Sequence, residues 1–222
     1  MLVLCHRGYH LHAPENTIDA FAAAIEAGAD GIETDVRLSA DGVAVLFHDR
    51  FAADGREVSA LSHAALSEAA GYPVPSLESA LRLSCRGADP ILWDLEIKTP
   101  QALHPALRTI NRLKDARRIL ITSFRHTLIE EASRLIDVEL GILVAHRPPD
   151  THLFPGWLAG HPKVNTIVWD YETIDEVLVA LTRAAGLRCF VYGAVTAAEH
   201  GELMAWNVDA VITDYPELVK KS

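Results

Sequence analysis

The stretch GIETDVRLSADGVAVLFHD, residues 31–49, contains two apolar runs separated by only a few polar residues. The runs are Gly31–Val36 and Val43–Phe47, and the tripeptide Ala-Asp-Gly lies between them at 40–42. An Asp-Gly pair between two extended segments is typical of a tight hairpin turn. Such a turn can join only antiparallel strands, because a parallel connection needs a dozen or more residues. The second run is therefore predicted to be the return strand of a hairpin.

Outside this hairpin, short apolar runs alternate with Ala/Leu/Glu-rich stretches at helical spacing. This alternation is typical of an α/β fold on a parallel sheet. Without the return strand eight candidate strands remain, the number that closes a parallel (β/α)8 TIM barrel. An open doubly wound sheet would show the same alternation, but the strand count and the polar strand ends favour the barrel. The eight strands are predicted at Leu2–Cys5, Gly31–Val36, Ile91–Ile97, Ile119–Thr122, Leu140–Val144, Thr166–Trp169, Cys189–Tyr192 and Ala210–Thr213.

The amphipathic stretches between these runs are predicted to be helices. They are Thr17–Ala27, Ser76–Leu83, Gln101–Leu113, Arg125–Ile136, Ile174–Ala185 and Ala197–Trp206. No linker or low-complexity tract divides the chain, so residues 1–222 are expected to form a single domain. The least regular part is residues 50–75, where an Asp-Gly pair and a Pro-Val-Pro segment indicate turns. We expect a short irregular excursion there.

Charge and composition exclude several function classes. The chain has 20 Lys+Arg against 30 Asp+Glu, a formal charge of −10, which repels nucleic acid and anionic lipid. No run of about 18 apolar residues occurs, so no stable membrane insertion is expected. The three cysteines are scattered without a CxxC or zinc-site spacing, and the N-terminus lacks a signal-peptide pattern. We expect a cytoplasmic protein with a small-molecule substrate, and no feature points to a particular oligomeric state.

Three carboxylates lie near the ends of two predicted strands. Glu33 and Asp35 are two residues apart and therefore point to the same side of one strand. Glu96 lies near the end of the next parallel strand, and such strand ends meet on one face of a barrel. Buried carboxylates are costly unless a cation neutralises them, and carboxylate oxygens select a hard ion. We predict that these residues hold one divalent cation, Mg²⁺ or Ca²⁺; the alternative is a network with Arg7 and Lys98 as the only counter-ions.

Two histidines lie at the ends of neighbouring extended segments. His6 follows the first strand and His48 follows the return strand of the hairpin. Imidazole titrates near neutrality, so such a pair beside a metal site is suited to general acid and base catalysis. Asp49 either orients the His48 ring or caps a turn. The remaining histidines lie in predicted loops and helices and are interpreted as structural.

The candidate residues belong to longer motifs spread over nearly the whole chain. These are His6-Arg7-Gly8, Pro14-Glu15-Asn16-Thr17, Gly28–Val36, Asp41-Gly42, His48-Asp49, Val74–Glu78, Leu95–Lys98, Ser123-Phe124 and Val208–Pro216. In order and spacing, the set resembles the motifs of the glycerophosphodiester phosphodiesterase family. The joint pattern is specific, whereas the first tripeptide alone would not be.

The resemblance implies a (β/α)8 barrel that hydrolyses glycerophosphodiesters to sn-glycerol 3-phosphate and an alcohol with one divalent ion. By position, the resemblance implies that Glu33, Asp35 and Glu96 hold the metal. It also implies that His6 and His48 are the general acid and base. It also implies that Arg7 and Lys98 contact the phosphate, which agrees with the cationic stabilisation that phosphoryl transfer requires. The nucleophile is either water or the glycerol 2-hydroxyl, the latter giving a cyclic phosphate.

Two segments depart from the family pattern. The sequence Tyr-Gly-Ala-Val at 192–195 stands where many members have Trp-Thr-Val-Asn, and residues 50–75 are short for the inserted region of the family. A more open site or a different diester, for example a lysolipid, is therefore an alternative. Phe124, Trp169 and Tyr192 are predicted to line the pocket and contact the substrate.

Two other function classes fit part of the pattern. A carbon–carbon lyase on the same barrel would use Lys98 as a Schiff-base amine, or a metal to bind an enolate. That function would leave the His-Arg-Gly and His-Asp motifs unexplained. A barrel that only binds phosphodiesters would not need an acid–base pair. Metal-dependent phosphodiester hydrolysis is therefore the predicted function.

Overall fold

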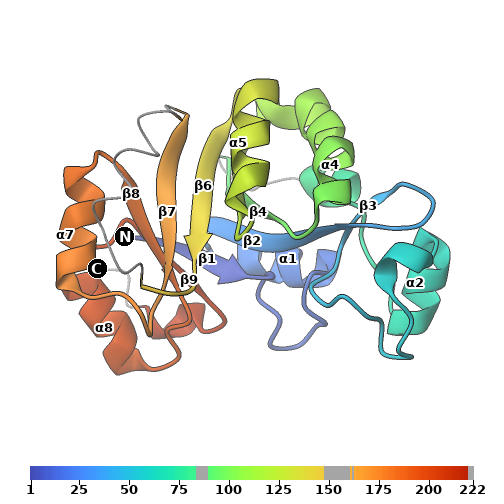
Figure 1. The fold of residues 1–222 in the computed structure, drawn as a ribbon. Coiled ribbons are helices and arrows are strands. Elements are labelled where there is room, and N and C mark those ends of the chain that lie inside the picture. The colour runs from blue at the N-terminus through green and yellow to red at the C-terminus, as the bar shows by residue number, and fades with distance from the viewer. Residues whose placement is uncertain (84–89, 148–160, 162, 220–222) are drawn as a thin grey trace.

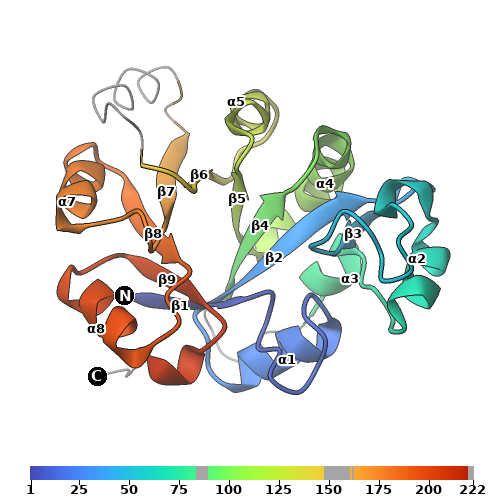
Figure 2. The ribbon, with the colours of Figure 1, turned by 60° about the horizontal axis from the view of Figure 1, so that its bottom comes forward.

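The computed structural model describes residues 1–83, 90–147, 161 and 163–219. In these ranges, parallel strands form a closed ring with helices outside it (Figures 1 and 2). The ring closes because β1 pairs in parallel with both β2 and β9. Its strands are β1 (Leu2–His6), β2 (Gly31–Leu38), β4 (Leu92–Ile97), β5 (Arg118–Ser123), β6 (Glu139–Val144), β7 (Val164–Asp170), β8 (Arg188–Tyr192) and β9 (Ala210–Thr213). The predicted eight-stranded parallel barrel is confirmed.

A short antiparallel strand, β3 (Ala44–Leu46), pairs with the end of β2 and lies outside the ring. Leu46 lies opposite Val36, and Ala44 lies opposite Leu38. Gly42 in the connecting turn has φ +80°, a conformation that glycine adopts without steric cost. The predicted hairpin is therefore confirmed, and the return strand brings the chain back toward the C-terminal ends of the barrel strands.

Helices cover the outside of the ring. Several begin at a residue whose side chain accepts a hydrogen bond from the first turn, as Thr17, Asp175 and Thr196 do. Such caps satisfy backbone donors that have no partner within the helix. The outer helices are α1 (Ile18–Glu26), α3 (Leu77–Leu81), α4 (Pro100–Leu113), α5 (His126–Leu135), α7 (Glu176–Ala184) and α8 (Ala197–Ala205), and short 3-10 turns lie at Val58–Ala60, Lys114–Ala116 and Pro216–Leu218.

The excursion at residues 50–75 is more regular than its sequence suggests. It contains α2 (His63–Ala70), which begins after the capping residue Ser62 and ends at Gly71 in a left-handed conformation. Figures 1 and 2 place α2 beyond β3, at the edge of the molecule. Leu66 of α2 is fully buried in a small apolar cluster, which also contains Val45 of the hairpin. The excursion therefore forms a compact layer over one end of β2.

Side chains alternate between the inside and the outside of the barrel wall. A cluster that includes Leu4, Leu92 and Phe190 fills the interior. Neighbours along the strands, such as Trp93, pack outward against the helices. The apolar interior ends where the strands reach their C-terminal ends, and polar residues follow it there. A parallel barrel places its functional groups on this face.

Cys85 lies outside the described residues, whereas Cys5 and Cys189 are both buried. Burial raises the pKa of the Cys189 thiol to about 12, so this thiol is protonated at neutral pH. Within the described ranges, no helix combines the length and apolarity needed to cross a bilayer.

Candidate active site

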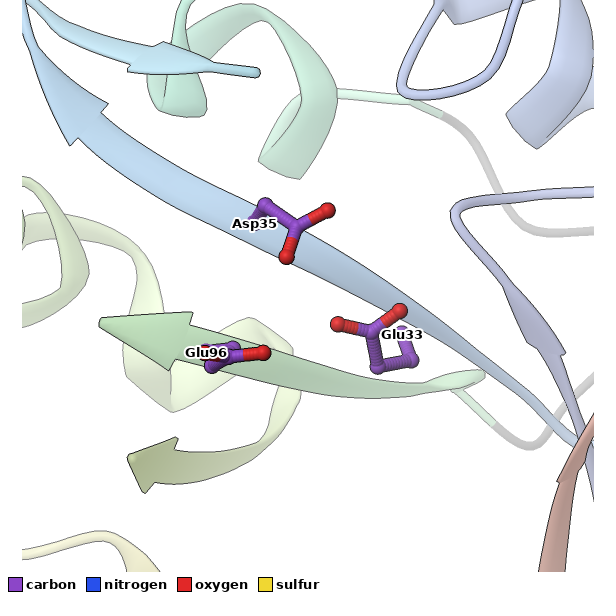
Figure 3. A group of neighbouring side chains, drawn as sticks. All are labelled: Glu33, Asp35 and Glu96. Atoms are coloured by element: carbon purple, nitrogen blue, oxygen red, sulfur yellow. The ribbon is translucent and has the colours of Figure 1, made fainter. Parts of the chain in front are cut away.

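Three carboxylates meet at the C-terminal ends of β2 and β4. Glu33 and Asp35 lie two residues apart on β2, and Asp35 is directly opposite Glu96 in the parallel ladder. One carboxylate oxygen of each residue lies within 4.8 Å of those of the other two. Figure 3 shows the three side chains directed toward a common space. All three residues are buried, so the structure brings the predicted metal ligands together in a site shielded from water.

Two cations accompany these carboxylates. Lys98 Nζ lies 3.1 Å from Asp35 Oδ1 and 3.0 Å from Glu96 Oε1. Arg7 Nε lies 3.3 Å from Asp35 Oδ2, and the Arg7 backbone N–H donates to Glu33 Oε2 at 3.2 Å. The structure therefore places both predicted phosphate-contacting residues against the carboxylate cluster.

The charge balance of the cluster fits a bound divalent cation. Burial raises the pKa of Glu33 well above its ordinary value, and the charges of Asp35 and Asp94 add to this effect. Burial also raises the pKa of Glu96, although Lys98 opposes the shift. Three carboxylates face only two cations among the described residues, Lys98 and Arg7, so the ionised cluster keeps a net negative charge. Three convergent carboxylates supply the hard oxygen ligands that Mg²⁺ and Ca²⁺ prefer, so the donor set fits either ion.

The loop before α1 supports the cluster from one side. Asn16 is buried and donates its Nδ2 to Asp35 Oδ2 at 2.9 Å, while its Oδ1 accepts from the Thr34 hydroxyl at 2.6 Å. Glu15 accepts from Arg7 Nη1 through both carboxylate oxygens, at 3.0 and 2.9 Å. These bonds fix the orientation of one candidate ligand and one candidate phosphate contact. Sequence reasoning assigned no role to Glu15 or Asn16, and their position in a family-like motif was the available signal.

His6 lies at the end of β1, and its Nδ1 is 2.7 Å from Asp214 Oδ1. An ionised carboxylate can only accept a hydrogen bond, so Nδ1 carries the proton and Nε2 remains available for the substrate. His6 Nε2 lies 3.8 Å from Glu33 Oε2, and His10 Nε2 contacts the same Asp214 oxygen at 3.0 Å. Burial acts to raise the pKa of Asp214, but the two histidines hold it well below its usual range. Asp214 therefore stays ionised and orients His6.

His48 follows β3 by two residues, and its Nδ1 is 2.8 Å from Asp49 Oδ1. By the same argument Nδ1 carries the proton and Nε2 is available for the substrate. Arg37 Nε donates to the His48 carbonyl oxygen at 2.8 Å, which anchors the backbone at this position. The backbone N–H of Phe47, the residue before His48, donates to the Asp35 carbonyl oxygen at 3.0 Å, which brings this segment beside the carboxylate cluster. The alternative that Asp49 orients the ring is thus the one observed.

A fourth carboxyl, Asp94, lies beneath the cluster and faces Glu33 across the β2–β4 ladder. Its Oδ1 accepts from the Thr122 hydroxyl at 2.6 Å, and its Oδ2 has no partner among the described residues. Burial raises the pKa of Asp94 to about 7. A proton retained near neutrality limits the negative charge below the cluster.

Gly8 closes the turn that carries His6 and Arg7. It has φ +82°, and an added Cβ would lie 2.8 Å from the backbone carbonyl carbon of Ala20. We expect Gly8→Ala to lower the free energy of unfolding by at least about 2 kcal/mol, because a left-handed conformation costs about 1–2 kcal/mol and the clash adds to it. Urea unfolding measures this change.

Gly28→Ala is the matched control for this substitution. Gly28 has φ +74°, but an added Cβ would meet nothing within 4 Å. We expect only the conformational cost of about 1–2 kcal/mol in this control. Equal destabilisation by the two substitutions would show that the close approach of the Gly8 turn to α1 has no energetic effect.

Phe124 and Tyr192 lie on the same face as the candidate active site. Phe124 follows β5 and Tyr192 ends β8, and their rings meet edge to face with centroids 6.1 Å apart. Phe124 is 43% exposed, so this ring is open to a ligand. Burial and a hydrogen bond to Asp170 raise the pKa of Tyr192, which keeps its hydroxyl protonated. These two predicted substrate contacts therefore stay candidates.

Trp169 lies on the other side of the barrel wall. Its side chain is buried, and its Nε1 donates to the Thr182 hydroxyl of α7 at 3.0 Å. Strand β7 extends to Asp170, one residue beyond the predicted end, and alternation along the strand turns Asp170 rather than Trp169 toward Tyr192. The prediction that Trp169 contacts the substrate is therefore wrong.

Comparison with known proteins agrees with this geometry. Residues 6–218 match the model of the glycerophosphoryl diester phosphodiesterase family. A glycerophosphodiester phosphodiesterase of Caldanaerobacter subterraneus is 29% identical over 97% of this chain and 95% of its own length.

Two solved structures have the same fold. The glycerophosphodiester phosphodiesterase of Thermotoga maritima has a TM-score of 0.85 and 26% identity, covering 98% of this chain and 96% of its own. A phosphodiesterase of Oleispira antarctica, solved with its product sn-glycerol-3-phosphate, has a TM-score of 0.83 and 22% identity. The match covers 99% of this chain and 95% of that chain. With the family match spanning nearly the whole chain, this protein belongs to the glycerophosphoryl diester phosphodiesterase family.

Proposed function

We propose that this protein uses one divalent cation and two histidines to hydrolyse glycerophosphodiesters to sn-glycerol 3-phosphate and an alcohol. The observation that carries the proposal is the convergence of Glu33, Asp35 and Glu96 within 4.8 Å of one another, on the barrel face that holds two oriented histidines. A phosphodiester hydrolase needs charge stabilisation at the phosphate and proton transfer at both the attacking and the leaving oxygen. This site supplies side chains for each of these tasks.

Glu33, Asp35 and Glu96 would hold the cation. When bound, Mg²⁺ or Ca²⁺ supplies Lewis-acid stabilisation of negative charge on the phosphoryl oxygens. Lys98 and Arg7 lie against the same carboxylates and would donate hydrogen bonds to phosphate oxygens. Asn16 keeps Asp35 in place while these groups engage the substrate.

The two histidines would move the protons of the reaction. The Nε2 of one histidine takes a proton from the attacking hydroxyl group, and the Nε2 of the other gives a proton to the leaving alcohol oxygen. The bond from phosphorus to that oxygen breaks as the bond to the attacking oxygen forms. The histidine that takes a proton would start neutral and end as imidazolium, whereas the histidine that gives a proton would start as imidazolium and end neutral. Asp214 and Asp49 hold the two rings through Nδ1 and stabilise the imidazolium form of each.

The attacking oxygen belongs either to water or to the glycerol 2-hydroxyl of the substrate. The second route releases the alcohol and leaves a cyclic phosphate, which water must then open to give sn-glycerol 3-phosphate. A 2-deoxy analogue of the diester separates these routes, because it can react only with water. Release of the alcohol from this analogue at the normal rate would identify water as the nucleophile.

A lyase that forms a Schiff base at Lys98 is less consistent with the site. Burial acts to lower the pKa of Lys98, but the charges of Asp35 and Glu96 outweigh it and raise the pKa above its ordinary value. A lysine held protonated is a poor nucleophile. The cytoplasmic location and the single-domain organisation stay predictions from the sequence.

The proposed function is tested by release of sn-glycerol 3-phosphate from glycerophosphocholine and glycerophosphoethanolamine. Reactions contain Mg²⁺, Ca²⁺ or EDTA. We expect release with at least one of the two ions and none in EDTA. Equal release in EDTA would contradict the metal-dependent part of the proposal. Lack of release from both diesters with either ion would mean that a wider range of diesters, including lysolipids, has to be tested.

A further inference from the structure

An open cavity of about 770 Å³ begins beside the carboxylate cluster. Its walls come from the end of β2, the excursion after β3, and the first residues of α4 and α5. Lys98 connects the cavity with the carboxylate cluster, because it lines the cavity and contacts Asp35 and Glu96. A substrate whose phosphate lies at the cluster can therefore place its remaining alcohol beside Lys98, in this space.

The cavity wall is rich in positive charge. Arg37, Arg50, Lys98 and Arg125 line it, and Glu57 is its one acidic lining residue among those described. This local excess is opposite to the formal charge of −10 of the whole chain.

Two of these cations have no carboxylate partner. Glu57 pairs with Arg50 at 3.2 Å, and Lys98 pairs with the carboxylate cluster. Arg37 and Arg125 make no ion pair within the described ranges, although Arg37 donates to the carbonyl oxygen of His48. The guanidinium groups of these two residues can thus bind an anion without first giving up a carboxylate partner.

Strand geometry explains why the positive residues continue the active site. Arg37 lies two residues beyond Asp35 on the same side of β2. Lys98 lies two residues beyond Glu96, directly after the end of β4, and its backbone N–H still donates to the Val36 carbonyl oxygen of β2. On each of the two strands, a positively charged side chain therefore follows the carboxylate toward the C-terminal face of the barrel. Arg125 adds a third element, the exposed start of α5.

The positive ends of two helices face the same space. α4 begins after Thr99 and α5 begins after Arg125, and neither capping side chain bonds to its helix. Both of these residues line the cavity. A helix N-terminus favours negative charge nearby, so the helix dipoles add to the effect of the guanidinium groups.

We infer that this cavity is an anion-binding subsite for a second acidic group of the substrate. The preferred substrates are then glycerophosphodiesters whose remaining alcohol carries a phosphomonoester. Guanidinium groups bind phosphate oxygens through charge-assisted, often paired hydrogen bonds. A quaternary or primary ammonium group would instead meet like charge. The inference rests on the proposed function, because it names the class of diester that the same site takes.

The test compares two diesters that differ by one group. Glycerophosphoglycerol is neutral beyond its diester, and its phosphorylated form carries a phosphomonoester on the terminal glycerol. The ³¹P signal of the diester reports its hydrolysis in the presence of a divalent ion. We expect kcat/KM of wild-type protein to be at least about tenfold higher for the phosphorylated diester, the scale of one hydrogen bond between charged groups.

Arg125→Gln is the diagnostic variant, because the side chain is exposed and its loss leaves the core intact. We expect this substitution to lower the ratio of the two kcat/KM values about fivefold or more. The double variant, with both Arg125→Gln and Arg37→Gln, is expected to bring the ratio near one. Arg134→Gln is the matched control. It removes one positive charge at the other end of the same helix, where Arg134 pairs with Glu130, and should leave the ratio unchanged.

Three outcomes would contradict the inference in distinguishable ways. A wild-type ratio of one or less refutes the subsite while the proposed function stands. A ratio that falls equally in the Arg125 and Arg134 variants shows that only the total charge matters. Hydrolysis of neither diester with Mg²⁺ or Ca²⁺, together with none of glycerophosphoethanolamine, refutes the proposed function and the subsite with it.

Discussion

His48→Ala is expected to lower kcat for glycerophosphodiester hydrolysis by about 10²- to 10⁴-fold, the usual contribution of a positioned general acid or base. The His48 ring is held through Nδ1 by Asp49, and Arg37 anchors its backbone. The substitution therefore removes a proton-transfer group whose orientation is fixed before substrate binds. KM is expected to change much less than kcat, because the ring acts on the reacting oxygens rather than on substrate affinity.

His104→Ala is the matched control for the loss of an imidazole. His104 is largely exposed on α4 and pairs there with Glu131. It should leave kcat within about twofold, because surface substitutions of this kind have small effects. Steady-state kinetics with a saturating divalent ion measures both variants. A His48 variant as active as the His104 variant would remove His48 from the mechanism.

Glu33→Gln is expected to stabilise the metal-free protein and to abolish its stabilisation by metal. Glu33 is 5% exposed, and its pKa is raised well above the ordinary value by burial and by neighbouring carboxylates. A carboxyl with a raised folded-state pKa destabilises the fold once the pH exceeds its unfolded-state pKa, because the unfolded chain then loses the proton more readily. Glutamine resembles the protonated form and removes this penalty.

The expected gain is about 1–3 kcal/mol in the free energy of unfolding at pH 8 in EDTA, the scale for an uncompensated buried charge. The gain should shrink as the pH is lowered and vanish only below the ordinary pKa of a glutamate, about 4.3, because wild-type Glu33 then keeps its proton in both the folded and the unfolded state. Mg²⁺ or Ca²⁺ at a hundredfold excess over its dissociation constant should stabilise the wild-type protein by about 2.7 kcal/mol and the variant little.

Urea unfolding with and without each ion measures these differences. Glu78→Gln is the control, because Glu78 lies on the outside of the barrel and pairs with Arg82 and Arg112. It should retain the full response to metal. A Glu33 variant that responds to metal as the wild type does would show that the ion binds elsewhere.

Local sequence patterns predicted most of the barrel and the centre of the site. The Asp-Gly turn identified β3 as a return strand, and this left the strand count that closes a barrel. The spacing of two residues between Glu33 and Asp35 placed both carboxylates on one side of β2. Such rules work because alternation and turn geometry depend only on neighbouring residues.

Contacts between distant segments were not predictable in this way. Asp214 holds His6 across 208 residues of sequence, and the contact exists because β9 closes the ring against β1. Asn16 reaches Asp35 from a loop that lies outside the strand pattern. Asp214 does follow the last predicted strand, so the strand-end rule used for the other residues would have selected it as a candidate.

Two local errors have equally physical causes. The apolar run predicts that the strand ends at Trp169, whereas β7 continues to Asp170, so Trp169 faces outward and bonds to Thr182. Helix α2 was missed because it is short and owes its stability to Leu66, which packs in a small separate cluster. Its boundary signals, Ser62 and Gly71, were present in the sequence.

The most direct test of the central claim follows hydrolysis of glycerophosphoethanolamine by ³¹P NMR, with wild-type protein and the Glu33→Gln variant at saturating Mg²⁺ or Ca²⁺. The diester signal should be replaced by that of sn-glycerol 3-phosphate in the wild-type reaction, and EDTA should stop this conversion. The variant should leave the diester intact while remaining folded. Conversion that continues in EDTA, or at the wild-type rate in the variant, would contradict hydrolysis at a divalent cation held by Glu33, Asp35 and Glu96.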